Sequence, residues 1–275
     1  QSLFSQTLVH DGFAIVIVDN CPDASAADAI RQLKADCPQT IELTALSETE
    51  PGVATARNTA MTAVRTDLVA FLDDDQTAPT YWLSRLLDNL ARYPASVTFG
   101  PVRTALPDSQ TRHRAYFEAF FARDPKLANG YVEETFGIGN ALVDFSTLTT
   151  PGAWFDTRMN EIGGEDDLLF ELGKAQNGQF AWAADADVLE HPDPKRISLS
   201  YTLRRAFAYG QGPVVLARVS KPPKYFTWAM WTVVGLGKTV WHGAQWIALE
   251  LIRHPNRAFQ LDATLRGMAK VLWFV

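Results

Sequence analysis

The sequence predicts an α/β protein built on a doubly wound sheet and followed by a helical C-terminal region. Apolar runs of strand length alternate with segments of helical spacing between residues 13 and 99, in the order β-α-β-α-β-α-β. This alternation is typical of sheets that carry helices on both faces. Residues 225–274 instead contain two long segments in which apolar residues recur at helical spacing.

The composition is that of a globular protein with a substantial core, because 47% of the 275 residues are hydrophobic and 20% are charged. The two cysteines, Cys21 and Cys37, lack the spacing of metal ligands, so a reducing compartment is the simpler expectation.

The net charge of −6 is unevenly distributed along the chain. Residues 195–275 contain twelve Lys or Arg and two acidic residues, a net charge of +10, whereas the remainder has 13 basic and 29 acidic residues, a net charge of −16. A basic C-terminal third indicates a polyanionic partner. Five of the eight tryptophans also lie there, and Trp with Lys and Arg is more typical of membrane interfaces than of nucleic-acid binding, so no nucleic-acid partner is expected.

The first predicted strand is the continuous apolar run at residues 13–18, which ends in Asp19 and Asn20. Such a run predicts a strand that is buried on both faces of a parallel sheet. A helix at residues 24–36 and an alternating strand at residues 41–46 follow.

The next predicted helix covers residues 53–64 and follows Gly52. Arg57 and Asn58 lie early in this helix, near backbone amides that favour phosphate. Ordinary exposed helix residues are the alternative interpretation of this pair.

Three adjacent carboxylates, Asp73, Asp74 and Asp75, follow the apolar strand at residues 68–72. Adjacent acids repel one another, and a divalent cation removes that cost. Oxygen-only ligands suit Mg²⁺ or Mn²⁺, and ligands in open α/β sheets bind beyond the carboxyl ends of strands. A solvated acidic turn, or a cap for the next helix, is the alternative.

The remaining elements of the predicted sheet region are helices at residues 80–93, 110–123 and 165–176, with strands at residues 97–99, 141–143, 180–183 and 188–189. Gly139 and Asn140 precede one of these strands, which indicates either a close approach of the backbone to another group or a plain turn. A second acidic cluster, Glu165, Asp166 and Asp167, opens a helix, where acids also simply complement the helix dipole.

A helical segment at residues 198–211 carries Arg204 and Arg205. The longest uncharged run of the segment at residues 225–251 covers residues 225–237, which is short of the ~20 residues that a spanning helix needs. We therefore expect an in-plane or re-entrant amphipathic helix, or else a buried helix of a small subdomain. Residues 256–274 predict a second amphipathic helix.

Five features occur in order along the chain. They are a strand that ends in Asp, a Gly-x-x-x-x-Arg-Asn helix start at Gly52, the Asp73–Asp75 cluster, a Glu-Asp pair at a helix start, and a His after two strands. This combination resembles the GT-A fold nucleotide-sugar transferases, specifically glycosyltransferase family 2, over about residues 1–210. The resemblance implies a Rossmann-like, mixed and mainly parallel sheet for residues 1–211. It also implies that the first strand of the family is missing before Gln1, and that residues 212–275 are a membrane-association region.

The resemblance also implies roles for individual residues. Asp19 would contact the uracil or its equivalent, Arg57 the base and diphosphate, and Asp73 the ribose hydroxyls, with Asp74 beside it. Asp75 would bind the divalent metal. His191 matches a metal-coordinating histidine of many GT-A enzymes, although a single histidine is more often structural.

Asp166 matches the general base, supported by Glu165, and Gly139 and Asn140 would line the donor-sugar and acceptor site. Arg204 or Arg205 would help to hold the diphosphate. The expected function is therefore inverting, Mg²⁺- or Mn²⁺-dependent transfer of sugar from a nucleotide-sugar, such as a UDP-sugar, by single displacement.

The basic, aromatic C-terminal region resembles that of members that extend lipid-linked oligosaccharides, including enzymes of bacterial exopolysaccharide assembly. This resemblance implies an anionic membrane surface as partner and a position at the cytoplasmic face of the inner membrane, peripheral or monotopic. Two other functions remain compatible with the sequence: a nucleotidyltransferase or phosphohydrolase with the same metal site, and a non-catalytic membrane-associated scaffold of the same fold.

Overall fold

The structure, a computed structural model, describes residues 1–8, 12–23, 25–150, 152–161, 163–219 and 222–274. The chain divides into two compact units. The first unit consists of residues 1–103 and 123–190, and the second unit consists of residues 104–122 and 191–275. The predicted domain boundary between residues 211 and 212 falls inside one continuous helix, Leu199–Val219 (α6). The boundaries between the two compact units lie at other residues.

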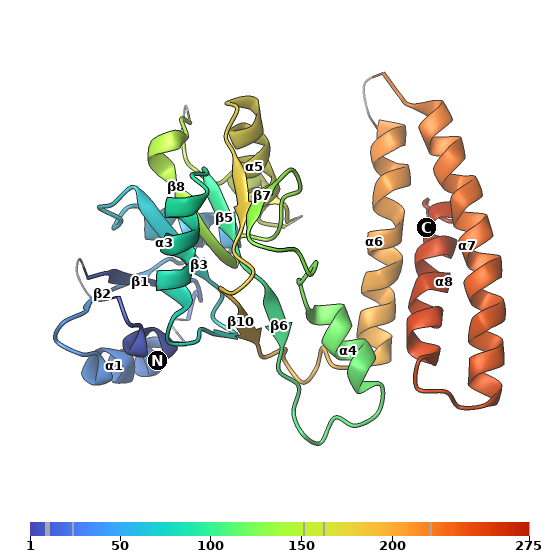
Figure 1. The fold of residues 1–275 in the computed structure, drawn as a ribbon, viewed down its shortest axis with the longest axis horizontal. Coiled ribbons are helices and arrows are strands. Elements are labelled where there is room, and N and C mark those ends of the chain that lie inside the picture. The colour runs from blue at the N-terminus through green and yellow to red at the C-terminus, as the bar shows by residue number, and fades with distance from the viewer. Residues whose placement is uncertain (9–11, 24, 151, 162, 220–221, 275) are drawn as a thin grey trace. The chain divides into compact units, whose positions relative to one another are not determined.

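A five-stranded sheet in the order β3-β8-β5-β9-β7 forms the centre of the first unit (Figure 1). Its strands are Leu68–Leu72 (β3), Asn140–Asp144 (β8), Val97–Phe99 (β5), Phe180–Trp182 (β9) and Gly130–Val132 (β7). β8 runs antiparallel to both of its neighbours, and only β5 and β9 pair in parallel within this sheet as the structure describes it. The predicted mixed sheet is therefore confirmed, but its pairings are less parallel than the apolar runs indicated.

Two smaller sheets complete the first unit's strands. Ala14–Asp19 (β1) and Glu42–Ser47 (β2) pair in parallel, from Ala14 opposite Glu42 to Asp19 opposite Ser47. Three short strands pair in the order β4-β10-β6, and they are Gln76–Thr77 (β4), Val188–Glu190 (β10) and Val102–Thr104 (β6). The expectation that the first apolar run is buried on both faces is wrong for Val16, Ile17 and Val18, which stay partly exposed.

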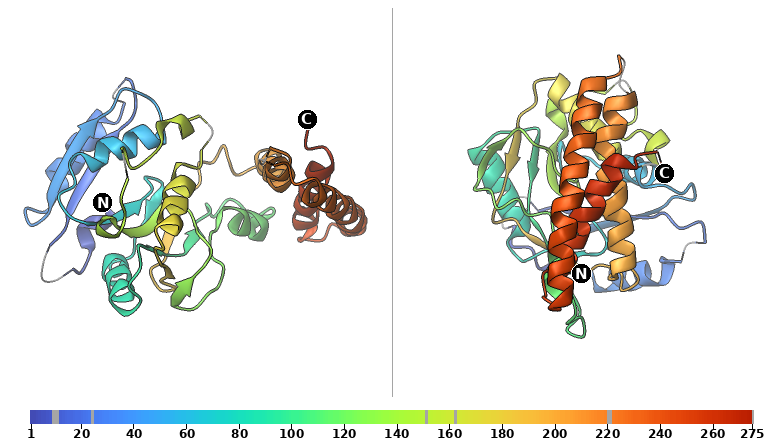
Figure 2. Two further views of the ribbon diagram at one scale, coloured as in Figure 1. Left: turned by 90° about the horizontal axis from the view of Figure 1, so that it is seen from above. Right: turned by 90° about the vertical axis from the view of Figure 1, so that its right-hand side faces the viewer.

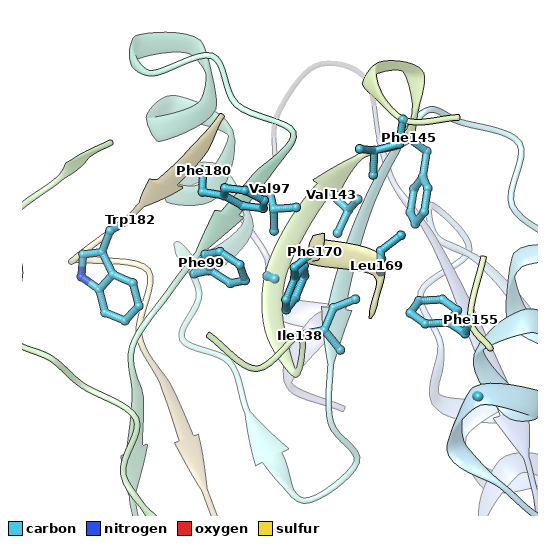
Figure 3. Packing of buried hydrophobic residues seen from close by; sticks show 13 residues of the cluster. Val97, Phe99, Ile138, Val143, Phe145, Phe155, Leu169, Phe170, Phe180 and Trp182 are labelled. Atoms are coloured by element: carbon cyan, nitrogen blue, oxygen red, sulfur yellow. The ribbon is translucent and has the colours of Figure 1, made fainter. Parts of the chain in front are cut away.

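Helices cover both faces of the five-stranded sheet. They are Val53–Met61 (α2) and Glu165–Ala175 (α5) on one face and Trp82–Arg92 (α3) on the other. Ala27–Asp36 (α1), between β1 and β2 in the chain, has no buried residue. Side chains of β8 alternate between the faces: Ala141 and Val143 pack with residues of α2 and α5, whereas Leu142 packs with α3. Figure 3 shows the cluster that contains Ala141 and Val143. In it the Phe99 ring meets the Phe170 ring edge to face and stacks on the Phe180 ring.

The second unit is helical. It contains Arg114–Phe121 (α4), the long helix α6, Tyr225–Leu251 (α7) and Arg257–Val271 (α8). α7 lies beside α8, and α8 also lies beside α6, as both views of Figure 2 show. Tyr116 of α4 joins them through a hydrogen bond of 3.0 Å from its hydroxyl to the Asp262 carboxylate. In the described part of the chain, no helix combines the length and the hydropathy needed to traverse a bilayer.

Candidate active site

The carboxyl end of β3 carries the first acidic cluster. Leu72 pairs with Asn140 in the antiparallel β3–β8 ladder, so the next residue, Asp73, lies opposite Gly139. The Asp73 amide donates to the Gly139 carbonyl at 3.3 Å. A Cβ atom at Gly139 would lie 2.0 Å from Oδ2 of Asp73, so only glycine leaves space for this carboxylate. The close backbone approach predicted at Gly139 is therefore present, and the group it approaches is Asp73.

Asp74 and Asp75 complete this cluster. Asp74 is exposed and Asp75 is partly exposed. Within the described part of the chain, neither carboxylate makes a hydrogen bond or ion pair, so both retain free oxygen atoms.

Arg57 of α2 connects the two acidic clusters. Its guanidinium hydrogen bonds to the Glu165 carboxylate, and its Nη2 lies 3.9 Å from Oδ1 of Asp73. The same guanidinium lies over the Phe155 ring, 5.6 Å from its centroid. Glu165 is buried and Arg57 nearly so, which makes this a desolvated ion pair and not a surface contact.

The second acidic cluster begins α5. Asp166 Oδ2 accepts a hydrogen bond of 3.2 Å from the Ile138 amide, and its Oδ1 accepts one of 3.0 Å from the Asp167 amide. Ile138 directly precedes Gly139, whose carbonyl accepts from Asp73. Residues 138 and 139 therefore join Asp166 to Asp73, as Arg57 joins Glu165 to Asp73.

Two cations face the Asp73 carboxylate. Arg57 and Arg123 each approach it to 3.9 Å, and Arg123 also lies 3.6 Å from the Glu190 carboxylate. Burial raises the pKa of Asp73 above its ordinary value; the two arginines oppose that rise, and Asp75 and Asp74 add to it. Burial likewise raises the pKa of Asp167, with Asp166 and Glu165 adding to the rise.

The amino end of α2 is occupied by the protein itself. Oδ1 of Asn160 accepts from the Ala54 and Thr55 amides at 3.0 and 3.3 Å, and the Gly52 amide donates to Asn20 at 2.8 Å. The expectation that these amides favour phosphate is therefore wrong, because side-chain oxygens already satisfy them. α2 contributes the Arg57 side chain to the site.

Two other predicted residues have structural contacts. Asn140 is fully buried; it accepts from Trp82 Nε1 at 2.8 Å and donates to the Pro101 and Ala186 carbonyls at 2.9 Å each. Because the side chain is fully buried and both of its N–H groups are used, a donor-binding role for Asn140 finds no support. Asp19 at the end of β1 is buried and accepts from the Cys21 and Ala26 amides, which fixes the loop before α1.

His191, Arg204 and Arg205 belong to the second unit, so their predicted roles at the acidic clusters remain predictions. Within that unit, Arg205 donates to the Tyr209 hydroxyl at 2.8 Å and stacks over its ring. Among the described residues, no three His, Cys, Asp or Glu side chains are grouped so as to hold a metal ion.

Arg123 and Asn160 are the two site residues that sequence reasoning missed. Arg123 ends a predicted helix and has no motif around it, yet its Nε is buried without a hydrogen-bond partner in the described structure. Asn160 lies about a hundred residues from the helix it caps, and no local pattern predicts such a contact.

A mixed sheet flanked by helices, with acidic and basic side chains close together at the end of one strand, is the arrangement expected of a GT-A fold glycosyltransferase. A sequence model of glycosyl transferase family 2 matches residues 1–149, which is more than half of the chain. The protein belongs to glycosyl transferase family 2.

Individual proteins are similar to this chain over different lengths. The succinoglycan biosynthesis protein ExoM of Rhizobium meliloti (strain 1021) is 27% identical over 197 residues, which is 72% of this chain and 62% of ExoM. The chain thus spans less than two thirds of that relative. The mannosyltransferase PcManGT from Pyrobaculum calidifontis, solved with GDP-Man and Mn²⁺, has a TM-score of 0.58 at 18% identity, covering 99% of this chain and 81% of that chain. TarS of S. aureus has a TM-score of 0.49 at 14% identity, covering 82% of this chain and 38% of that chain.

Proposed function

We propose that this protein is an inverting, metal-dependent glycosyltransferase that moves a sugar from a nucleotide-sugar to a hydroxyl group by single displacement. The observation that carries this proposal is the joining of the two acidic clusters: Arg57 contacts both Glu165 and Asp73, and residues 138 and 139 connect Asp166 to Asp73. One cluster would bind the donor's diphosphate and its cation, and the other would receive a proton.

The donor would bind at the end of β3. Asp75 would hold Mg²⁺ or Mn²⁺, since these ions take one or two carboxylates and complete their shell with phosphate oxygens and water. The free oxygens of Asp74 and Asp75 fit such a shared shell, and PcManGT was solved with Mn²⁺. When bound, the cation neutralises the charge that develops on the leaving diphosphate. His191 remains a candidate for a further ligand.

The remaining donor contacts follow from charge. Arg57 and Arg123 present guanidinium groups beside Asp73, and such groups pair well with diphosphate oxygens. Asp73 would accept hydrogen bonds from the ribose hydroxyls, Asp19 would contact the base, and Arg204 or Arg205 would support the diphosphate. A nucleotide-sugar donor is favoured because the similar fold of PcManGT was solved with GDP-Man; a UDP-sugar is the donor that we propose here.

Asp166 would act as the general base. Its carboxylate is partly exposed and is oriented by the Ile138 amide, which leaves oxygen lone pairs for the acceptor hydroxyl. Glu165 would act through Arg57, by fixing the guanidinium that faces Asp73. One base without a separate nucleophile gives direct attack on the anomeric carbon and inversion of its configuration.

For the acceptor we propose a lipid-linked saccharide of exopolysaccharide biosynthesis, with the protein held peripherally or monotopically at the cytoplasmic face of the inner membrane. The similarity to ExoM supports an exopolysaccharide pathway, and the net charge of +10 over residues 195–275 supports an anionic membrane surface.

A panel of nucleotide-sugars with Mn²⁺, followed by product analysis, tests this function. We expect one donor to yield a glycoside of inverted configuration, and we expect turnover to stop in excess EDTA. Release of sugar 1-phosphate and nucleoside monophosphate without a glycoside, in the presence of membrane extracts that contain lipid-linked saccharides, would instead identify a phosphohydrolase. Unchanged turnover in EDTA would remove the metal from the mechanism.

A further inference from the structure

The exposed side of α7 is apolar along its whole length. The exposed large side chains on it include Phe226, Val233, Leu236, Val240, Trp241, Ile247 and Leu251. With 100° between successive residues, these positions and the exposed Ala229, Met230, Gly237, Ala244 and Ala248 fall within an arc of about 140°. No charged residue lies within this arc. We call these twelve residues the α7 stripe; it runs about 40 Å along the 27-residue helix.

The opposite side of α7 already has a partner. Gly235 packs against Lys270 and Gly267 of α8, and His242 hydrogen bonds to Gln260 at 2.8 Å. A Cβ atom at Gly267 would lie 2.8 Å from the Thr239 amide, so the two helices approach closely there. α7 is therefore fixed by α8 on one side while it presents an uncharged apolar side to the surroundings. Contiguous apolar surface of this extent marks an interaction site.

The charges around the α7 stripe indicate what covers it. The two acidic residues of the region 195–275, Glu250 and Asp262, each pair with an arginine: Glu250 with Arg257 at 3.3 Å and Asp262 with Arg266 at 2.5 Å. The remaining ten cations of this region have no acid within it to offset them. Lys224 and Arg253 stand exposed at the two ends of α7.

This charge distribution distinguishes between two possible occupants. A second copy of the chain would bring the same net charge of +10 to the interface, and like charges oppose such a pairing. Helices that pair in coiled coils also carry complementary charges beside their apolar seam, whereas α7 has only Lys238 and Glu250. An anionic lipid surface offers apolar contact for the stripe and negative charge for the flanking cations.

We infer that α7 lies in the plane of an anionic membrane surface, with the α7 stripe inserted among the lipids and α8 on the side facing water. This inference rests on the proposed membrane attachment and assigns it to one face of one helix. Trp241 would lie near the headgroups, where indole rings partition favourably. The acceptor of the proposed transfer would then be lipid-anchored on the same surface.

The first test is flotation with phosphatidylcholine vesicles that do or do not contain phosphatidylglycerol, at low and high ionic strength. We expect the wild-type protein to bind the anionic vesicles and to dissociate in part as salt is raised. The double variant Val233→Glu/Val240→Glu should bind roughly tenfold more weakly or worse, because two carboxylates would enter the lipid interface. Both positions are exposed, at 70% and 66%, so the fold should tolerate them.

The matched control is Ser109→Glu/Ala208→Glu, which changes the net charge equally at exposed positions of the same unit outside the α7 stripe. It should retain binding. If both double variants bind like the wild type, the α7 inference is overturned while membrane attachment survives. If both lose binding equally, the effect is one of net charge and the assignment to α7 also fails.

A second measurement does not depend on the folding of a charged variant. In a Cys21→Ser/Cys37→Ser background, an environment-sensitive fluorophore at Val233→Cys should shift to shorter wavelength on anionic vesicles, and the same fluorophore at Ala208→Cys should not. Wild-type protein that binds no vesicles would end both the α7 inference and the proposed attachment, while the transfer chemistry is tested separately by product analysis. A dimer in sedimentation that Val233→Glu/Val240→Glu dissolves would show that a second copy covers the stripe and would overturn the inference.

Discussion

Replacing Arg57 with methionine should destabilise the first unit strongly. The Arg57 and Glu165 side chains are only 17% and 7% exposed, so Arg57→Met leaves a carboxylate buried without its partner. Removing one member of a buried ion pair costs about 3–5 kcal/mol. The contacts of the Arg57 guanidinium with Asp73 at 3.9 Å and with the Phe155 ring are lost as well. We expect the free energy of unfolding of this unit to fall by about this amount.

The assay is urea unfolding, with hydrogen exchange of peptides from α2 and α5 to assign the transition to the first unit. Glu165→Gln should cost less, because Arg57 keeps the Asp73 carboxylate and the Phe155 ring as partners. The double variant Arg57→Met/Glu165→Gln should lose less unfolding free energy than the two single variants lose together, and the difference, the coupling energy, should be about 1–3 kcal/mol.

The matched control is Arg158→Met, which removes a largely exposed arginine from its ion pair with the partly exposed Asp156. Exposed pairs of this kind contribute little, so no measurable loss is expected. A loss below about 1 kcal/mol for Arg57→Met, or single-variant losses that simply add, would refute the argument that a buried guanidinium joins the two clusters.

Three further predictions test other parts of the structure. Gly139→Ala should displace the Asp73 carboxylate, because Oδ2 of Asp73 lies 2.0 Å from the new Cβ position, and should weaken donor binding in titration calorimetry. The control Gly152→Ala, whose new Cβ meets no atom within 4 Å, should leave the affinity unchanged. Equal donor affinities for the two variants would contradict the close approach. Asn160→Ala should destabilise α2 by about 1–2 kcal/mol, because the Ala54 and Thr55 amides lose their acceptor; unchanged exchange of these amides would contradict the cap. Burial raises the pKa of Tyr116 above its ordinary 10.0, so the unfolded chain loses the Tyr116 proton at a lower pH than the folded protein does. The free energy of unfolding should therefore fall as the pH rises above 10.0, by up to about 1.4 kcal/mol per pH unit. Tyr116→Phe should remove that dependence in alkaline urea titrations, and a persistent slope would assign it to another group.

The main helices and the longer strands follow from sequence because each has its own periodicity. The predicted helix at residues 225–251 agrees with α7 at both ends, since its apolar pattern begins and ends sharply. The strands β4, β6 and β7 have only two or three residues each and the sequence does not predict them, although it predicts β5, β9 and β10, which are equally short. Pairing partners depend on distant residues, which explains why the antiparallel neighbours of β8 were not predicted.

The sequence predicts those parts of the candidate site whose residues are close together in the chain. Three adjacent aspartates after a strand and three acids at a helix start are visible in the sequence, and Arg57 stands in a recognisable helix start. Contacts that join these segments are not local. The cap from Asn160 to α2, the approach of Arg123 to Asp73, and the burial of Asn140 against Trp82 each join residues about fifty or more positions apart. Sequence periodicity carries no information about such contacts.

The most direct test of the account is donor binding and transfer measured together for Asp166→Asn. If one acidic cluster binds the donor and the other receives the proton, this variant should bind the nucleotide-sugar and Mn²⁺ as the wild type does, while its transfer rate falls by about 10²–10⁴-fold. A wild-type transfer rate in Asp166→Asn would contradict the division of roles between the two clusters.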